Sequence, residues 1–434
     1  MGFTGIAMLS ATAGAMLAVS LSSMPLLQTK LSPAEKAVFA NGESISRSSM
    51  RLPELTRPVN VLVLGTKVLT SDLDEKPVQD LGYHALVNSF DGLSDTMLLL
   101  RFAPDQEKLT VLSIPRDTRT YVPGIGRTKL NAANYHGGPA LTARATSDLL
   151  GGVGIDRYIR VNVQGVEKLI DALGGVTVYV PKDMKYTDHS QHLYINLKEG
   201  KQRLNGEQAL QFLRFRYDQY GDVGRVQRQQ IFMRAMIEQV LNPTTLARVP
   251  KILSVIQSNL DTNLTVEELV ALVGFGAGTK RSNTQMLLVP GQFSGTGHSE
   301  VSYWLPDRRR IRQMMARHFD IGYSDEQEIN PSYLRIAIQD STDEPEAVKA
   351  LVKTLREAGY RNIYISDRWS ETLQTTRIVA QQGDSRSADD IRSYLRLGEV
   401  RIESTGSLTS DVTIQLGQDW LEQPDPTDNE LLDL

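Results

Sequence analysis

The chain has 434 residues and 41% hydrophobic residues, a length and composition typical of a globular protein with about two or three domains. Its formal net charge of −4 gives no general nucleic-acid-binding character, so nucleic acid is not an expected partner. The absence of cysteine excludes disulfide bonds, thiol catalysis and thiolate metal sites.

An apolar segment opens the chain. No charged side chain occurs from Gly2 to Thr29, and this length can cross a bilayer core as a helix. We therefore predict one transmembrane anchor at residues 1–30. Cleavage as a signal peptide is the alternative, but the apolar stretch is long for one and lacks a basic leading segment. Residues 31–58, rich in Ser, Arg and Glu with several prolines, are predicted to form a linker.

The next segment, residues 59–245, has the pattern of an α/β domain. Val59–Gly65 is a short apolar run that ends in glycine, which is typical of a buried strand. Asp95–Phe102 and Leu109–Pro115 predict two strands joined by a short polar loop, and hence a hairpin. The remaining predicted elements are a strand at Val176–Val180 and helices at about Gly138–Leu150, Gln164–Leu173, Gly206–Leu213 and Arg225–Leu241.

The predicted strands and helices also indicate where particular side chains lie. Because Pro115 ends the second strand of the hairpin, Arg116 and Asp117 are expected at its carboxyl-terminal tip. They would lie on the side of the sheet where Gly65 ends the first strand. Asn205, with Gln208 three residues later, predicts a capping box at the start of a helix.

The rest of the chain divides into three parts. Residues 246–329 are predicted to be a helical extension, and residues 330–418 a small second α/β domain. In the latter, Tyr333–Ile338, a helix at Pro345–Ala358 and Ile363–Ile365 form a βαβ pattern. Residues 419–434 are acid-rich and lack basic residues, so we predict a disordered tail.

The most informative feature is a cluster of opposite charges between residues 214 and 229. Guanidinium groups bind phosphate oxygens through paired hydrogen bonds, and carboxylates recruit the metal that shares the remaining charge. In the predicted helix, Arg225, Arg228 and Gln229 share one face near its start. The cluster therefore indicates a site for a phosphorylated anion, with a solvated helix end as the alternative. Its charged members are Arg214, Arg216, Asp218, Asp222, Arg225 and Arg228.

Four other motifs accompany this cluster in a fixed order: Ser94–Met97, Ile114–Thr118, Lys129–Asn134 and Asn205–Ala209. Taken singly, each is compatible with a turn, a surface ion pair or a helix entry. Taken together after a single anchor, they resemble the LytR-CpsA-Psr family over about residues 59–241. Residues 330–418 are also similar to the small domain that often follows this catalytic domain.

The resemblance implies a mixed central sheet flanked by helices, followed by the small α/β domain. It also implies a phosphotransferase that moves a glycopolymer from an undecaprenyl-pyrophosphate carrier onto peptidoglycan. Its partners would be the lipid-linked glycan, the peptidoglycan acceptor and membrane lipid. The implied location is the cytoplasmic membrane, with a single span and the soluble domains outside the cytoplasm, although Lys30 and Lys36 would by themselves argue for the opposite orientation.

The resemblance also assigns site residues. Asp95 and Asp222 would bind Mg²⁺ or Mn²⁺. Asp117 or Asp218 would assist removal of the proton from the accepting hydroxyl, or would orient an arginine. The implied pyrophosphate ligands are Arg116, Lys129, Arg214, Arg216 and Arg225, with Arg228 and Gln229 in support.

The chain departs from the family pattern at two places. Leu93 stands where many members have arginine directly before the Ser-Asp motif, so one pyrophosphate contact is missing or comes from another residue. Thr66 and Lys67 stand where many members have aspartate soon after the first strand. A metal ligand would then be lost, or Lys67 would take over part of the metal's charge.

Three alternatives to the transferase remain open. A pyrophosphatase would release the carrier's phosphate to water with the same arginines. A non-catalytic protein would only bind polyprenyl phosphate or wall polymer, as Leu93 and Lys67 allow. A transcriptional regulator lacks support, because no helix-turn-helix signature or basic domain is recognisable. No His-Glu-x-x-His pair, Gly-x-Ser-x-Gly elbow or P-loop is present, which argues against three other enzyme classes.

Overall fold

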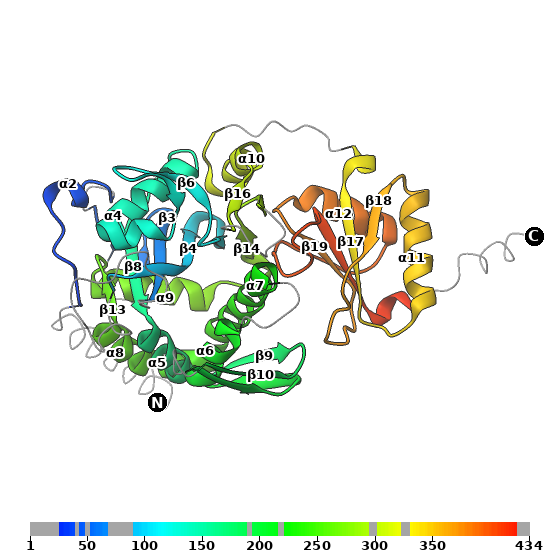
Figure 1. The fold of residues 1–434 in the computed structure, drawn as a ribbon, viewed down its shortest axis with the longest axis horizontal. Helices are drawn as coiled ribbons and strands as arrows, with labels where there is room; N and C mark the ends of the chain where they lie inside the picture. The colour runs from blue at the N-terminus through cyan, green and yellow to red at the C-terminus, as the bar shows by residue number, and fades with distance from the viewer. Residues whose placement is uncertain are drawn as a thin grey trace, which may run out of the picture. The chain divides into compact units, whose positions relative to one another are not determined.

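The computed structural model describes residues 26–39, 43–47, 53–67, 90–188, 193–215, 221–294, 302–322 and 330–422. The chain divides into two compact units (Figure 1). The first unit comprises Met1–Thr284 and Val289–Ser324, and the second comprises Gln285–Leu288 and Asp325–Leu434. None of the helices in the described ranges is long and apolar enough to span a bilayer. Most of the predicted anchor, residues 1–25, lies outside those ranges.

A mixed sheet forms the centre of the first unit, and the strands that this unit contributes to it have the order β13-β8-β3-β4-β5. Strand β4 is antiparallel to both β3 and β5, and β8 is parallel to β3. The predicted hairpin is confirmed, and β3 and β5 point the same way, so both strands end at the same edge. The strands are β3 (Val59–Lys67), β4 (Leu93–Ala103), β5 (Lys108–Ile114), β8 (Arg157–Asn162) and β13 (Leu260–Thr262).

Helices surround this sheet (Figure 1). They are α2 (Pro33–Lys36), α4 (Ala132–Leu149), α5 (Val163–Leu173), α6 (Gly206–Arg214), α7 (Gly221–Val240), α8 (Val249–Asn259), α9 (Val266–Gly278) and α10 (Arg308–Phe319). Short antiparallel pairs complete the unit. They are β1 (Ser46–Arg47) with β2 (Glu54–Leu55), β6 (Arg119–Val122) with β7 (Gly126–Lys129), β9 (Val176–Val180) with β12 (Gly200–Leu204), β10 (Met184–Asp188) with β11 (Leu193–Leu197), and β15 (Gly291–Phe293) with β16 (Trp304–Pro306).

Helix boundaries follow local chemistry. The predicted capping box at α6 is confirmed, because the Asn205 side chain accepts from the Gln208 N–H at 2.9 Å and the Gln208 side chain accepts from the Asn205 N–H at 3.1 Å. Helix α4 begins at Ala132, before the predicted start near Gly138. The backbone is non-helical at Gly137 and Gly138, where φ is −157° and 60°. The sequence pattern therefore located only the part after this kink.

Part of the segment predicted to be a linker packs onto the first unit. Phe39 and Ile45 are only 3% and 0% exposed, and the Phe39 ring lies 5.2 Å from that of Tyr158. The Glu43 carbonyl accepts a hydrogen bond from Arg157 Nη2 at 2.7 Å. Two isolated apolar side chains in this polar segment thus attach it to the first unit, which its composition did not predict.

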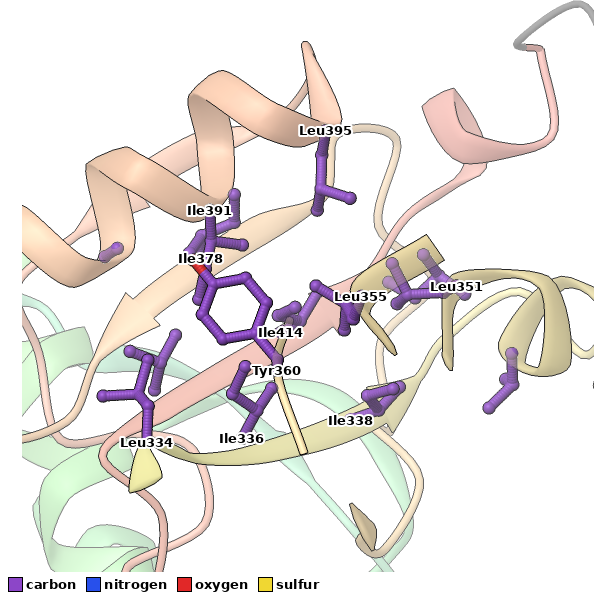
Figure 2. Packing of buried hydrophobic residues seen from close by; sticks show 14 of the residues in the cluster. Leu334, Ile336, Ile338, Leu351, Leu355, Tyr360, Ile378, Ile391, Leu395 and Ile414 are labelled. Carbon is purple, nitrogen blue, oxygen red and sulfur yellow. The ribbon is translucent and has the colours of Figure 1, made fainter. Parts of the chain in front are cut away.

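The second unit contains a sheet with the order β18-β17-β21-β19-β20. Strand β17 runs parallel to β18 and α11 connects them, so the predicted βαβ pattern is confirmed. Figure 2 shows its core, in which Ile336, Leu351 and Ile414 are fully buried. The elements are β14 (Thr284–Leu288), β17 (Arg335–Asp340), α11 (Pro345–Glu357), β18 (Asn362–Ile365), β19 (Arg377–Ala380), α12 (Ser385–Leu395), β20 (Glu399–Arg401) and β21 (Val412–Leu416). The mixed α/β fold of both units agrees with the sequence prediction.

Candidate functional site

Three cationic side chains surround a buried carboxylate at the end of β5. Asp117 is 4% exposed, and its carboxylate accepts from Lys129 Nζ at 2.8 Å and from Arg225 Nη2 at 3.0 Å. Arg116 Nε lies 3.4 Å from the same carboxylate. These cations come from three different elements, namely the β5 tip, strand β7 and helix α7. The structure therefore brings together four of the residues that the sequence assigned to the site.

Backbone hydrogen bonds hold the segment that carries this carboxylate. Pro115 ends β5, and its carbonyl accepts from both the backbone N–H and the hydroxyl of Thr118, at 3.0 and 2.6 Å. The Asn131 N–H donates to the Arg116 carbonyl at 3.1 Å. The Trp304 N–H donates to the Asp117 carbonyl at 2.9 Å. The charged side chains thus project from a backbone that is fixed on both sides.

The cations determine the ionisation of Asp117. Burial alone would raise the pKa of its carboxyl group, because a charged group loses solvation. The charge of Arg116, the hydrogen bond and charge of Lys129 and the charge of Arg225 outweigh burial and hold the pKa below its usual range. Asp117 is therefore a stable anion, which makes it a poor proton acceptor.

This lowered pKa predicts a pH-dependent stability. A carboxyl whose pKa is lower in the folded state contributes stability above its unfolded pKa of about 3.9 and loses that contribution as pH falls through the folded pKa. Asp117→Asn should therefore flatten the decline of the unfolding free energy below about pH 4. Denaturant unfolding of both proteins between about pH 2.5 and 7 measures this, with exposed Asp105→Asn controlling for loss of one charge. An unchanged slope in Asp117→Asn would contradict the assignment.

A second carboxylate lies beside the first. Asp95 Oδ1 accepts from Arg116 Nη1 at 2.6 Å, and the Asp95 side chain remains 26% exposed. Its neighbour Ser94 is fixed by a backbone hydrogen bond to the Asn131 carbonyl at 3.2 Å. Arg116 therefore bridges the two carboxylates, which the sequence placed in separate motifs.

Helix α7 supplies more than Arg225. Arg228, one turn later, is 6% exposed and donates from Nη2 to the Phe215 carbonyl, with its guanidinium 5.6 Å from the Phe215 ring centre. It thereby fixes the residue that follows α6. Gln229 is half-buried, so none of the three polar residues predicted near the start of α7 is fully exposed.

Several predicted site residues are only partly placed. Arg214 is half-buried in the last turn of α6, one residue beyond the predicted end of that helix at Leu213. Arg216 and Asp218 lie outside the described residues. Asp222 belongs to the first turn of α7, and its side chain is not described.

The residues that depart from the family pattern lie at the same place in the sheet. Leu93 and Lys67 are paired opposite each other across β4 and β3, beyond a bulge between Gly65 and Thr66. Both replacements therefore alter a single place at the edge of the sheet, two residues before Asp95. The sequence alone did not connect them, because the strand register was unknown.

Only part of the predicted metal site lies in the described residues. Among the residues that the structure describes, no three His, Asp or Glu side chains lie close enough to share an ion. Asp95 does fit a Mg²⁺ ligand, because it is a partly exposed oxygen donor and Mg²⁺ is often bound by one or two carboxylates together with substrate phosphates. Asp117 is less suitable, since three cations already surround its carboxylate.

A buried network that the sequence did not reveal supports the segment before Asp95. Arg160 is 2% exposed, and it donates to Asp261 Oδ2 at 2.6 Å, to Thr29 Oγ1 at 2.5 Å and to the Phe90 carbonyl at 3.2 Å. Asn134 Nδ2 donates to the same carbonyl at 2.8 Å. The network joins residues far apart in the chain to the start of β4.

Family comparisons agree with this architecture. The LytR_cpsA_psr family model matches residues 27–320. The model described as LytR cell envelope-related transcriptional attenuator matches residues 333–420. The first match covers more than half of the chain.

Individual relatives match mainly the first unit. The polyisoprenyl-teichoic acid–peptidoglycan teichoic acid transferase TagV of Bacillus subtilis (strain 168) is 31% identical over 239 residues, which are 53% of this chain and 60% of TagV. The corresponding transferase TagU of Oceanobacillus iheyensis is 32% identical over 253 residues, 57% of this chain and 70% of TagU. The regulatory protein MsrR of Staphylococcus aureus (strain COL) is 35% identical over 173 residues, 39% of this chain and 51% of MsrR.

Solved structures give the same picture. The crystal structure of B. subtilis TagV matches with a TM-score of 0.50 and 27% identity, covering 62% of this chain and 99% of that chain. A solved Streptococcus agalactiae protein matches with a TM-score of 0.51 at 24% identity, covering 63% and 91% of the two chains, and shows the fold alone. With its charged site at the edge of this α/β sheet, the chain belongs to the LytR_cpsA_psr family.

Proposed function

We propose that this protein is a phosphotransferase that moves a wall glycopolymer from an undecaprenyl-pyrophosphate carrier to peptidoglycan. The observation that carries the proposal is the convergence of Arg116, Lys129 and Arg225 on Asp117, beside the partly exposed Asp95. The names of TagV and TagU, both teichoic acid transferases, support it. The protein would act at the outer face of the cytoplasmic membrane, which digestion of its soluble domains by protease added to spheroplasts would test.

The chemistry follows from where charge moves. The acceptor hydroxyl attacks the phosphorus that bears the glycan, the bond to the bridging oxygen breaks, and polyprenyl phosphate leaves with the electron pair. Negative charge grows on the leaving phosphate, where Arg116 and Arg225 would stabilise it more than they stabilise bound substrate. Their preorganisation by Asp117 means that little rearrangement is needed during the reaction.

Asp117 would then orient the cations and would not accept the hydroxyl proton. Its carboxylate already accepts from Lys129 and Arg225, and its lowered pKa makes it a weak base. Of the two aspartates considered for proton removal, Asp218 is therefore the better candidate. A pH–rate profile unchanged by Asp218→Asn would exclude that role.

We also propose Mg²⁺ or Mn²⁺ as the cofactor, held by Asp95 together with Asp222. The ion would supply positive charge to the phosphate oxygens. Asp95 is suited to this task because Arg116 fixes one of its oxygens and the side chain stays partly exposed. Arg116 would therefore both bind phosphate and orient a metal ligand.

A transfer assay tests these proposals together. The purified protein should attach a glycan from its polyprenyl-pyrophosphate form to peptidoglycan oligomers in the presence of Mg²⁺, and excess chelator should stop the reaction. Full activity in chelator would exclude the metal, while no product of any kind would exclude catalysis. A pyrophosphatase uses the same cations, so release of glycan phosphate without attachment to the acceptor would favour that second function.

A further inference from the structure

The hairpin of β6 and β7 carries an exposed face that begins at the site. Arg119 pairs with Lys129 and Tyr121 pairs with Arg127, so these four side chains point to the same side of the hairpin. Arg119, Tyr121 and Arg127 are exposed, with Tyr121 at 57%, and Lys129 is half-buried. We call these four side chains the β6–β7 face.

The opposite side of the hairpin is an anchor. Thr120 and Val122 are 4% and 0% exposed. At the base, Thr118 bridges to Trp304, and the Leu130 N–H donates to the Thr118 carbonyl at 2.9 Å. The exposed side chains are therefore carried on a fixed support.

All charged side chains of the hairpin are positive. Between Thr118 and Asn131 the sequence contains three cations and no acid, although the whole chain has a net charge of −4. No ion pair between described residues includes Arg119 or Arg127. Arg119 instead lies 5.6 Å from the ring centre of Tyr303. An anionic ligand would therefore meet these guanidinium groups without displacing a carboxylate.

The β6–β7 face is continuous with the charged site. Lys129 Nζ is bonded to Asp117 at 2.8 Å and lies 5.6 Å from the same Tyr303 ring centre as Arg119. Side chains two residues apart on a strand are about 6.6 Å apart. Cationic groups thus extend outward from Asp117, with Tyr121 paired opposite Arg127 in the hairpin register.

A solvated hairpin could also carry two arginines and one tyrosine, since single exposed aromatic residues are ordinary. Three features together distinguish this one: continuity with the buried site, absence of acids in the hairpin, and a tyrosine paired opposite an arginine. Guanidinium groups bind phosphate oxygens with paired hydrogen bonds, and a tyrosine ring offers an apolar face with a polar tip. This combination suits a chain in which sugars or polyols alternate with phosphates.

We propose that the β6–β7 face binds the phosphodiester-containing glycopolymer segment next to the donor pyrophosphate. Arg119 and Arg127 would contact its phosphates, and Tyr121 would pack against its carbon-rich groups. The inference rests on the proposed function and assigns substrate selection to residues outside the reacting centre. The competing occupant is an anionic membrane surface, which Ile125 at the turn, 40% exposed, would also suit.

The test compares two donors on the same polyprenyl-pyrophosphate carrier, one with a neutral disaccharide and one extended by a glycerol-phosphate oligomer. Arg119→Ala with Arg127→Ala should raise KM about tenfold or more for the extended donor, because two charge-assisted contacts are lost. KM for the disaccharide donor should stay the same. Tyr121→Ala should act in the same direction, and Arg144→Ala, at an exposed position of α4, should change neither KM.

Two direct binding measurements separate the possible outcomes. Calorimetry with a carrier-free glycerol-phosphate oligomer should show binding to the wild-type protein and a weaker interaction with the double variant. If no donor is turned over but this difference persists, the transferase proposal fails and the inference stands. Equal KM changes for both donors, or no change for either, would overturn the inference. If the double variant no longer sediments with phosphatidylglycerol vesicles while its KM for both donors is unchanged, the occupant would be the membrane and the inference would be overturned.

Discussion

Arg225→Ala should lower the rate of glycopolymer transfer by about 10²–10³ while the protein remains folded. Arg225 is 6% exposed and fixed against Asp117 at 3.0 Å, so it is a preorganised donor in a site sheltered from water. Removing such a donor to a developing charge typically has an effect of this size. Arg225→Lys should recover only part of the rate, because an ammonium cannot make the paired contact with phosphate.

The fold should survive because Asp117 keeps two partners. Lys129 at 2.8 Å and Arg116 at 3.4 Å still face its carboxylate when Arg225 is removed. The kcat of transfer and the thermal unfolding curve together measure the prediction. Arg234→Ala is a matched control on the same helix, where Arg234 pairs with Glu238 at 3.2 Å, and its rate should change little. A folded Arg225→Ala protein with a normal rate would show that the cations around Asp117 are only structural.

The sequence predicted the parts of this site that are close to a strand end. Pro115 stops β5, and the apolar run before it determines the strand, so Arg116 and Asp117 could be placed at the tip. An apolar run that ends in a glycine likewise predicted the direction of β3 in the sheet. A short apolar run that ends at a glycine or proline thus predicts where a side chain leaves the sheet, although it does not predict the partners of that side chain.

What the sequence missed depends on register and on distant pairing. The β6–β7 hairpin was overlooked because each strand has only four residues and β7 contains no apolar side chain. The pairing of Lys67 opposite Leu93 could be known only from the register of β3 against β4. Arg214 was expected just past a helix, but the α6 helix includes it, since nothing in the local sequence stops the helix earlier.

The pair of Arg160 and Asp261 was also invisible, because it joins β8 to β13 across 101 positions of sequence. Both side chains are 3% exposed, and such buried charges are tolerated only with partners. Asp261 accepts in addition from the Thr29 N–H at 2.6 Å. Loss of the Asp261 carboxylate would leave the buried Arg160 charge without this partner and would release the segment around Thr29.

Asp261→Asn should therefore destabilise the first unit by about 3–5 kcal/mol. The cost arises from the uncompensated guanidinium, while the shape of the side chain is nearly kept. Denaturant unfolding measures it, and hydrogen exchange should rise at residues 26–29 and 90–92, which the Arg160 network holds. Because those latter residues lead into Asp95, the transfer rate should fall as well.

An exposed pair gives the matched control. Lys198 and Asp183 are 2.7 Å apart, but their side chains are 78% and 58% exposed, so Asp183→Asn should leave stability and hydrogen exchange unchanged. Replacing both buried partners, as Arg160→Met with Asp261→Leu, should recover much of the lost stability, since apolar side chains need no charge partner. Transfer should nevertheless stay impaired in that double variant, because the Phe90 carbonyl has lost the Arg160 donor. If Asp261→Asn behaved like the exposed control, the pair would not hold the segment before Asp95.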